Sequence, residues 1–389
     1  MDDGGGLGVC GRARRLGRPQ APSDDRPAWA RYLGQAEVTG EQVDGDTVTT
    51  EFGGRAACLR GGTWRSSTRD AGSQDLVVFL QGGGACWEGF CLAVTEAPAG
   101  IPTIDILDPA LGANPVADWN VAYLPYCDGS LFVGDADDDD DGDGEDDRFH
   151  RGLANLSASL DVAQERFPSP RRVLFTGSSG GGFGVSLGLP LVRATWPDAE
   201  IIALADSAVG IARGPDDRDF VAGLVDEWGA RELLPDGCEG CLDGGHLVPV
   251  VEHHLDQDPA IRMGVFGSWY DSIIGDVFLD VTPSEHRDMV EIETGRAHDA
   301  RPDRYRRFII DGRMHTTLLG DASGIVGSDL NALEVPPEII GALASIELGS
   351  LETTASADGS RVSDWIAALI DGDDAGWPDT VDPAGAPPD

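Results

Sequence analysis

The sequence contains no lysine, so all 28 of its basic side chains are arginines, against 68 aspartates and glutamates. The formal net charge is −40. Nucleic acids and anionic membrane surfaces are bound through basic patches, so we expect neither as a partner. A surface this rich in carboxylates suits a protein from a high-salt setting, where counterions screen the repulsion between them.

Long hydrophobic runs are also absent. No stretch of about 18 apolar residues is available to span a bilayer, and no apolar stretch of the secretory-signal kind follows Arg14 and Arg15. Hydrophobic residues still make up 41% of the chain, enough for a sizeable core. We predict one domain over residues 31–370, between a disordered segment at 1–30 and a disordered acidic tail at 371–389, and we expect a monomer.

Cysteine is sparse, but six of the seven cysteines are spaced as disulfide candidates. These candidates are Cys58, Cys86, Cys91, Cys127, Cys238 and Cys241. Three disulfides would indicate an oxidising compartment, so we predict a secreted protein, with a cytoplasmic one as the alternative. Cys238 and Cys241 could instead form half of a zinc site, but no second cysteine or histidine pair completes four ligands.

Short apolar runs alternate along the chain with helix-like stretches. The run Leu76–Leu80 is continuously apolar and ends at a glycine triplet, which is typical of a strand buried on both faces. Similar runs lie at 121–124, 173–175, 201–204, 263–266 and 308–310. Helices are predicted at 153–167 and 185–196, the first from apolar residues three or four positions apart. This alternation predicts an α/β fold with a mostly parallel central sheet and helices on both faces.

A candidate nucleophile follows the run at 173–175. Gly177-Ser178-Ser179-Gly180-Gly181 matches the GxSxG elbow in the strand–turn–helix context that the elbow requires. The glycines leave room for a cramped turn that exposes the Ser179 hydroxyl. The alternative is a glycine-rich loop that binds an anion or simply turns, although no Walker A or GxGxxG pattern fits.

Serine catalysis also needs an oxyanion hole and a base. The glycine triplet 82–84 ends an earlier strand, where α/β-hydrolases place a loop that supplies one oxyanion amide, and Gly180 would supply the second. His315 lies on a loop after the last predicted strand and is the candidate base. Asp271 and Asp206 compete for the acid. Asp271 is favoured because it follows the later strand, and Asp206 is given a structural or site-wall role.

Several motifs in this order resemble the pectin acetylesterase and Notum family of carboxylesterases. They are Val78–Trp87 with Cys91, Tyr123–Gly129, His150–Asn155, Gly177–Gly182, Ala205–Ser207, the Asp271 segment and His315-Thr316. The resemblance implies an α/β-hydrolase fold and a triad of Ser179, Asp271 and His315. It also implies oxyanion amides from Gly83, Gly84 and Gly180, and a Cys86–Cys91 disulfide beside the site. Trp87, Asp206 and His150 are expected to form part of the site wall.

These features predict a serine carboxylesterase that needs no cofactor and forms an acyl-enzyme. The resemblance implies an ester substrate, often an acetyl ester on a polysaccharide, or a lipid acyl ester as in Notum. Two other functions are weighed: a non-catalytic member that binds glycans or lipids, and a thioesterase or acyltransferase.

An acidic insert at 135–147 is unusual and is expected to overhang the mouth of the site. Asp137, Asp139 and Asp141 are spaced like the first ligands of an EF-hand loop, but Arg148 stands where that loop has its bidentate glutamate. A solvated loop is therefore favoured over a weak structural Ca²⁺ site.

Overall fold

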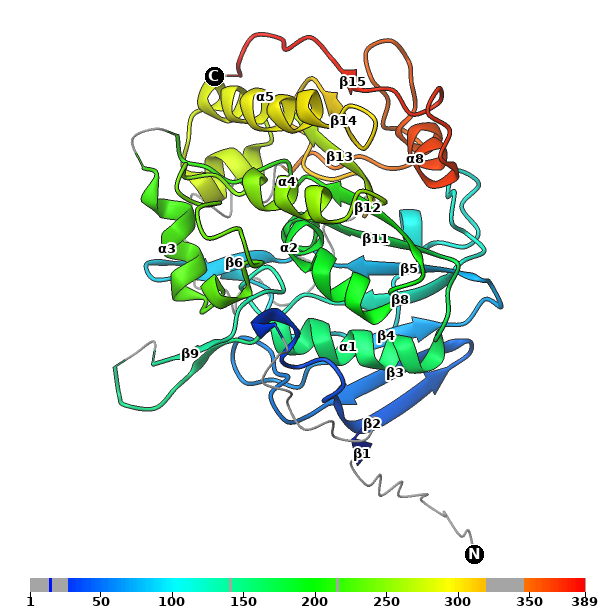
Figure 1. Cartoon of the computed structure of the whole chain (residues 1–389), viewed down its shortest axis with the longest axis vertical. Coiled ribbons are helices and arrows are strands. Elements are labelled where there is room, and N and C mark those ends of the chain that lie inside the picture. The colour runs from blue at the N-terminus through cyan, green and yellow to red at the C-terminus, as the bar shows by residue number, and fades with distance from the viewer. Residues whose placement is uncertain (1–13, 16–26, 140–141, 215–216, 320–345, 389) are drawn as a thin grey trace, which may run out of the picture.

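A central sheet of 11 strands organises the chain in the computed structural model, which describes residues 14–15, 27–139, 142–214, 217–319 and 346–388 (Figure 1). In spatial order its strands are β1 (Arg14–Arg15), β2 (Glu37–Asp44), β3 (Thr47–Phe52), β4 (Arg65–Arg69), β8 (Asn120–Leu124), β5 (Asp75–Leu80), β11 (Arg172–Ser178), β12 (Glu200–Asp206), β13 (Arg262–Ser268), β14 (Tyr305–Ile310) and β15 (Thr380–Val381). From β8 to β15 all neighbouring strands are parallel. β1 to β4 pair antiparallel with one another, and β4 pairs antiparallel with β8. The fold is that of an α/β-hydrolase, as predicted.

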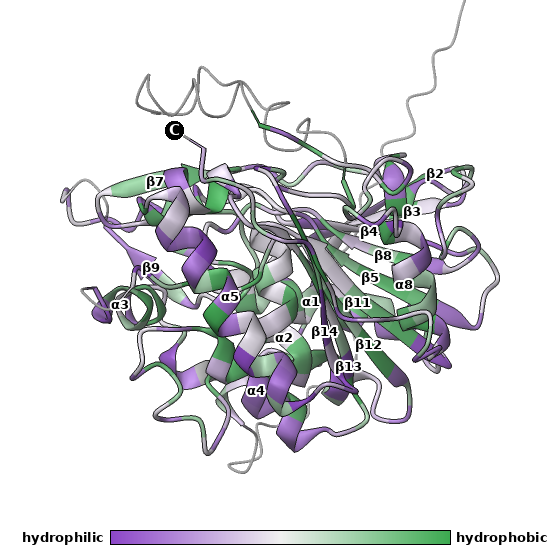
Figure 2. Ribbon diagram, turned by 90° about the horizontal axis from the view of Figure 1, so that it is seen from above, coloured by the Kyte–Doolittle hydropathy of each residue, from purple (hydrophilic) through white to green (hydrophobic). Residues whose placement is uncertain are grey.

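The parallel strands are buried on both faces. In β5, Leu76, Val78 and Leu80 belong to one core cluster, whereas Val77 and Phe79 belong to the other. Successive side chains of a strand point to opposite faces, so a continuous apolar run is what this position in the sheet requires. α1, α2, α4 and α5 cover the first face and α8 covers the second (Figure 2).

The helices include several that the apolar spacing did not predict. Their bounds are α1 (Gly152–Arg166), α2 (Gly180–Thr195), α3 (Asp219–Glu227), α4 (Val248–Gln257), α5 (Pro283–Ala300) and α8 (Val362–Asp371), with 3-10 turns η1 (Ala28–Ala30), η2 (Asp105–Leu107) and η3 (Arg231–Leu233) and a π-helix η4 (Ile273–Leu279). α5 begins at a capping box in which the Thr282 and Glu285 side chains each bond the other's backbone N–H. α2 begins at Gly180, five residues before the predicted start, because the glycines after Ser179 already form its first turn.

The prediction of a disordered tail at 371–389 is wrong for the described part. β15 pairs with β14, and the Trp377 side chain is completely buried against Trp365 of α8. Asp382 donates its backbone N–H to the Ile309 carbonyl at 2.9 Å. This segment is mostly polar, but its one aromatic residue, Trp377, is buried. The packing of Trp377 stabilises the attachment of the segment to the sheet edge. The predicted segment 1–30 lies mostly outside the described residues.

The acidic insert starts and ends as a short hairpin of β9 (Ala136–Asp138) and β10 (Arg148–His150). Asp137, a candidate calcium ligand, accepts hydrogen bonds from Arg55 and Arg151. Asp139 accepts backbone N–H groups from its own turn, and Asp141 lies outside the described residues. Hydrogen bonds from Arg55 and Arg151 to Asp137 therefore attach the base of the insert to the rest of the domain.

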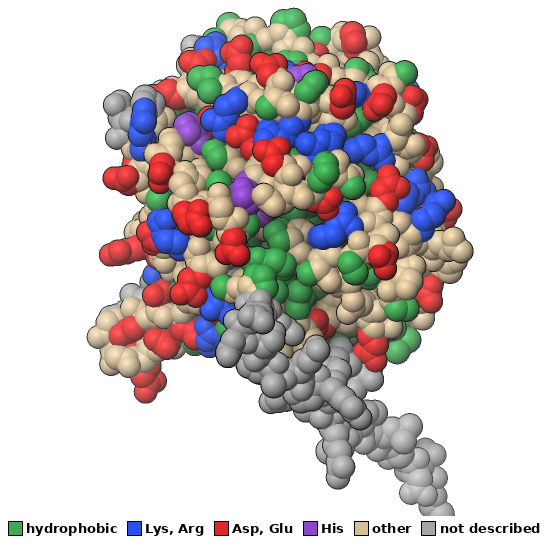
Figure 3. Space-filling view, viewed as in Figure 1, with side chains coloured by type: hydrophobic (Ala, Val, Ile, Leu, Met, Phe, Trp, Pro, Cys, Tyr) green, Lys and Arg blue, Asp and Glu red, His purple; other side chains and the backbone are tan. Residues whose placement is uncertain are grey.

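Charged side chains of both signs are exposed on the face of the molecule drawn in Figure 3. On the face shown in Figure 3, acidic side chains are spread widely and arginines lie among them, so the excess of carboxylates forms no single patch there. Several arginines of the described residues are paired with carboxylates, for example Arg193 with Asp258 and Arg301 with Asp256. None of the helices in the described ranges is long and apolar enough to cross a membrane.

The buried carboxylate of Asp75 connects the first residues of β5 and β11. Asp75 at the start of β5 accepts hydrogen bonds from Arg171 and Arg172, and these arginines lower the pKa of Asp75 to about 2 although burial opposes the shift. A lowered carboxyl pKa stabilises the fold above the unfolded pKa near 4, and that contribution is lost as the pH falls through about 2. We expect Asp75→Asn to lower the free energy of unfolding at pH 7 by about 1–2 kcal/mol, with the difference vanishing near pH 2.

Urea unfolding at several pH values measures this effect. Asp371→Asn is a matched control because Asp371 also pairs with Arg172, at 3.4 Å, but is exposed, so it should change stability by less than about 0.5 kcal/mol. A loss in Asp75→Asn that does not depend on pH would contradict the ion-pair explanation.

Candidate active site

Ser179 occupies a strained turn between β11 and α2. Its φ of 53° and ψ of −124° are a conformation that non-glycine residues rarely adopt. Its backbone N–H donates to the Asp206 carbonyl at 2.8 Å, which ties the turn to the neighbouring strand. A Cβ at Gly177 or Gly181 would lie 2.5 Å or 2.0 Å from the Leu80 carbonyl oxygen. Only glycine fits these positions, so the motif is required by the crossing of the two chain segments.

The glycine triplet lies directly against this turn. A Cβ at Gly82 would come within 2.8 Å of the Ser179 Cβ, and one at Gly180 within 3.0 Å of the Gly84 carbonyl oxygen. Gly84 has a φ of 93°, which favours glycine. Gly180 is the first residue of α2, so its N–H has no carbonyl partner within the helix. Of the predicted oxyanion residues, Gly84 and Gly180 therefore line the same pocket as Ser179, whereas a Cβ at Gly83 would meet the Tyr126 ring at 2.5 Å.

Asp271, which follows β13, contacts the predicted base. Its two carboxylate oxygens lie 3.0 Å and 2.9 Å from the Nδ1 of His315, and both side chains are buried. Its Oδ1 also accepts the backbone N–H groups of Ile273 and Ile274, which fixes the carboxylate in place. Nδ1 carries a proton to donate here, so Nε2 of neutral His315 is left as a proton acceptor.

The other ring nitrogen of His315 is available for chemistry. His315 Nε2 is buried and has no hydrogen-bond partner in the described part of the chain. No hydrogen bond joins Ser179 and His315 among the described residues, and such bonds often tighten only with substrate. The His315 loop is held by its backbone N–H, which donates to the Glu347 carbonyl at 2.8 Å.

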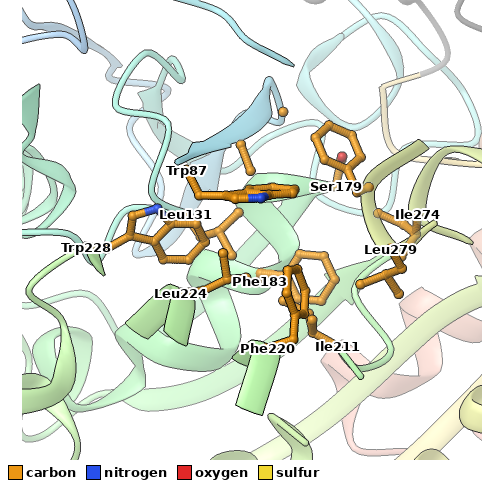
Figure 4. Close-up of a pocket in the computed structure, with 14 residues that line it drawn as sticks. Trp87, Leu131, Ser179, Phe183, Ile211, Phe220, Leu224, Trp228, Ile274 and Leu279 are labelled. Atoms are coloured by element: carbon orange, nitrogen blue, oxygen red, sulfur yellow. The ribbon is translucent and has the colours of Figure 1, made fainter. Parts of the chain in front are cut away.

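An apolar pocket lies beside Ser179 (Figure 4). It encloses about 430 Å³ of space, its open mouth included, and apart from the serine it is lined by glycine, aliphatic and aromatic residues. Its lining comprises Gly84, Ala85, Trp87, Leu131, Ser179, Gly180, Phe183, Ile211, Phe220, Leu224, Trp228, Ile274, Phe278 and Leu279. Trp87 stacks on Phe90 and meets Phe220 edge to face, so the aromatic wall is a connected layer.

Two predicted wall residues lie behind the pocket. His150 is completely buried, with Nδ1 3.3 Å from the Asp128 carbonyl oxygen and its ring against that of Trp228. Asp206 is completely buried at the end of β12, where its carboxylate turns toward backbone N–H groups. Neither lines the space, and of the three predicted wall residues only Trp87 does.

The sequence reasoning missed most of the pocket. Phe220 and Leu224, one helical turn apart, come from α3, for which no helix was predicted. The spacing of apolar residues in Asp219–Trp228 is a signal that could have found this helix. The insert reaches the same region, because the Asp135 N–H donates to the Trp228 carbonyl at 2.7 Å.

The six candidate cysteines form three disulfides in the structure: Cys58–Cys127, Cys86–Cys91 and Cys238–Cys241. Cys86–Cys91 closes the hairpin of β6 (Gly84–Trp87) and β7 (Phe90–Ala93), which presents Trp87 to the pocket. Among the described residues, the one cluster with metal-ligand spacing is Cys238, Cys241 and His253, and its two cysteines are already bonded to each other.

Comparison with known proteins agrees with the architecture. The chain has an α/β-hydrolase fold by its sheet order, and residues 40–212 match the family model described as pectinacetylesterase, which confirms the predicted resemblance over that segment. The match indicates a carboxylic ester hydrolase. It includes Ser179 and the glycine triplet and ends before Asp271 and His315.

A crystal structure of the Wnt deacylase Notum from Drosophila is similar to this chain at 18% identity, with a TM-score of 0.48. The alignment covers 68% of this chain and 83% of that one. No curated protein sequence matches the chain.

Proposed function

We propose that the protein is a serine carboxylesterase in which Ser179, His315 and Asp271 act as the catalytic triad. The observation that carries this proposal is the combination of a strained Ser179 turn with a buried Asp271–His315 pair in one α/β-hydrolase sheet. The pectinacetylesterase match over residues 40–212 supports the reaction class.

The chemistry follows from the atoms in place. Ser179 Oγ attacks the ester carbonyl carbon while His315 Nε2 takes the hydroxyl proton, and Asp271 stabilises the resulting imidazolium. Backbone N–H groups of Gly83, Gly84 and Gly180 bind the oxyanion. The tetrahedral intermediate collapses when the C–O bond breaks and His315 gives its proton to the leaving alcohol. A water then repeats the cycle on the acyl-enzyme and releases the acid.

The pocket favours an acyl group longer than the acetyl group expected from the resemblance. An acetyl group carries one methyl, which would bury little of a wall built from Trp87, Phe183, Phe220 and Phe278. Each additional CH₂ that leaves water for this wall contributes about 0.8 kcal/mol. The polar sugar of an acetylated polysaccharide would have to remain outside the pocket, at its mouth.

The test is hydrolysis of 4-nitrophenyl esters of increasing acyl length. We expect kcat/KM to rise about fourfold per CH₂ from acetate until the pocket is filled, and then to fall. Phe278→Ala should reduce this rise while leaving acetate hydrolysis nearly unchanged. A maximum at acetate would show that the pocket does not hold the acyl chain.

Two related activities need separate measurements. A thioesterase would prefer acyl thioesters to oxygen esters with the same acyl group, and an acyltransferase would pass the acyl group to an added alcohol faster than to water. We place the protein in an oxidising compartment, supported by its three disulfides.

A further inference from the structure

Asp206 lies between the segments that carry the proposed nucleophile and the proposed base. It is the last residue of β12, opposite Ser178 of β11 on one side and Phe266 of β13 on the other. Its backbone carbonyl accepts the N–H of Ser179 at 2.8 Å. The backbone of Asp206 therefore holds the nucleophile turn directly.

The carboxylate of Asp206 reaches both segments. Ser178 Oγ–H donates to Oδ2 at 2.6 Å. The backbone N–H of Thr317 donates to both oxygens at 3.1 Å, and the N–H of Leu318 donates to Oδ2 at 2.9 Å. One buried carboxylate thus connects the residue before Ser179 to the residues two and three positions after His315.

These contacts favour the ionised form, because each of them places a donor against a carboxylate oxygen. Every partner is a donor, and in the described part of the chain no arginine or histidine pairs with Asp206. A buried anion without a counterion destabilises a fold, so a purely structural connector would be better served by a neutral side chain. Burial raises the pKa of Asp206 to about 6, while the Ser178, Leu318 and Thr317 hydrogen bonds and the charge of His315 oppose the rise.

We propose that Asp206 is a positioning residue that fixes the His315 loop relative to Ser179 and, as a second negative charge behind His315, favours the imidazolium. This inference rests on the proposed esterase function for its kinetic consequence. Among the side chains named here, Asp206, Asp271 and His315 are the titratable groups of the site, since Ser178, Thr317 and Leu318 do not titrate in the working range.

Asp206→Asn tests the charge and the connection together. The asparagine keeps one acceptor oxygen but presents an NH₂ group to N–H donors. We expect kcat for a 4-nitrophenyl ester to fall about 10- to 100-fold with little change in KM, because the acyl pocket is untouched. The acid limb of the kcat/KM profile should move to lower pH by at least about 0.5 unit, since a nearby negative charge no longer stabilises protonated His315.

The pKa of His315 can also be measured without any substrate. Its imidazole resonance is followed by NMR as the pH changes and is assigned by its loss in His315→Gln. The expected result is a lower pKa in Asp206→Asn. A slower enzyme with the His315 pKa and the acid limb unchanged would overturn the proposal and leave only a structural role.

Ser178→Ala distinguishes the hydrogen-bond connection between the two segments from the negative charge of Asp206. It removes one donor and keeps the carboxylate, so kcat should fall about three- to tenfold with no lowering of the His315 pKa. If Asp206→Asn does not fold, an unchanged kcat in Ser178→Ala overturns the proposal. If the wild type hydrolyses no ester, the esterase function fails, while the NMR comparison still decides the role of Asp206.

Discussion

Replacing Ser179 by alanine is expected to lower kcat for ester hydrolysis by about 10⁴-fold or more. The substitution removes the only atom that can form the acyl-enzyme in this mechanism, and His315 has no other hydroxyl to deprotonate in the proposed reaction. The pocket stays intact, so an ester should still bind with nearly unchanged affinity. Initial rates on a 4-nitrophenyl ester, together with labelling by a fluorophosphonate, measure the effect.

Ser186→Ala provides the matched control. Ser186 is a buried serine of α2, the helix that follows Ser179, and its hydroxyl donates to the Gly182 carbonyl at 3.5 Å. It should keep nearly full activity and full labelling. Activity in Ser179→Ala within tenfold of the wild type would refute the triad and would point to a different nucleophile.

Asp271→Asn is expected to lower kcat by about 10³- to 10⁴-fold. An asparagine NH₂ group facing Nδ1 of His315 would favour the tautomer whose proton is on Nε2, and that tautomer cannot accept the proton of Ser179. The imidazolium also loses its counterion. The fold should survive, because the amide oxygen can still accept the N–H groups of Ile273 and Ile274.

Asp276→Asn is a suitable comparison, because Asp276 lies in the π-helix η4, which begins two residues after Asp271. Asp276 pairs with Arg313 at the surface, so its replacement should change kcat less than about threefold. Rates of the wild type and both variants are compared at the same pH. Equal losses of kcat in Asp271→Asn and Asp276→Asn would show that either substitution disturbs the structure of this segment, and that the loss is not specific to the carboxylate of Asp271.

The sequence was sufficient for the parts of the site that depend on local chemistry. The run Leu76–Leu80 had to be a doubly buried strand, and the glycines around Ser179 had to form a tight turn. His315 could be chosen because it follows a late apolar run, and parallel strands bring their carboxyl ends to one edge of the sheet.

The acyl pocket could not be predicted in the same way. Its aromatic wall combines Trp87, Phe183, Phe220 and Phe278, which come from four separate segments with no shared pattern. The same limit applies to the insert, where Asp137 pairs with Arg55, 82 positions away. Such contacts are set by the packing of the whole domain, because no local periodicity records them.

The attachment of the last residues to the sheet edge has a practical consequence for preparing the enzyme. The Trp269 indole donates to the Asp382 carbonyl at 2.7 Å, and the Tyr270 hydroxyl donates to the Gly385 carbonyl at 2.6 Å. These two aromatic residues directly precede Asp271. Removing residues 382–385 to aid crystallisation would therefore take away contacts that support the proposed catalytic acid.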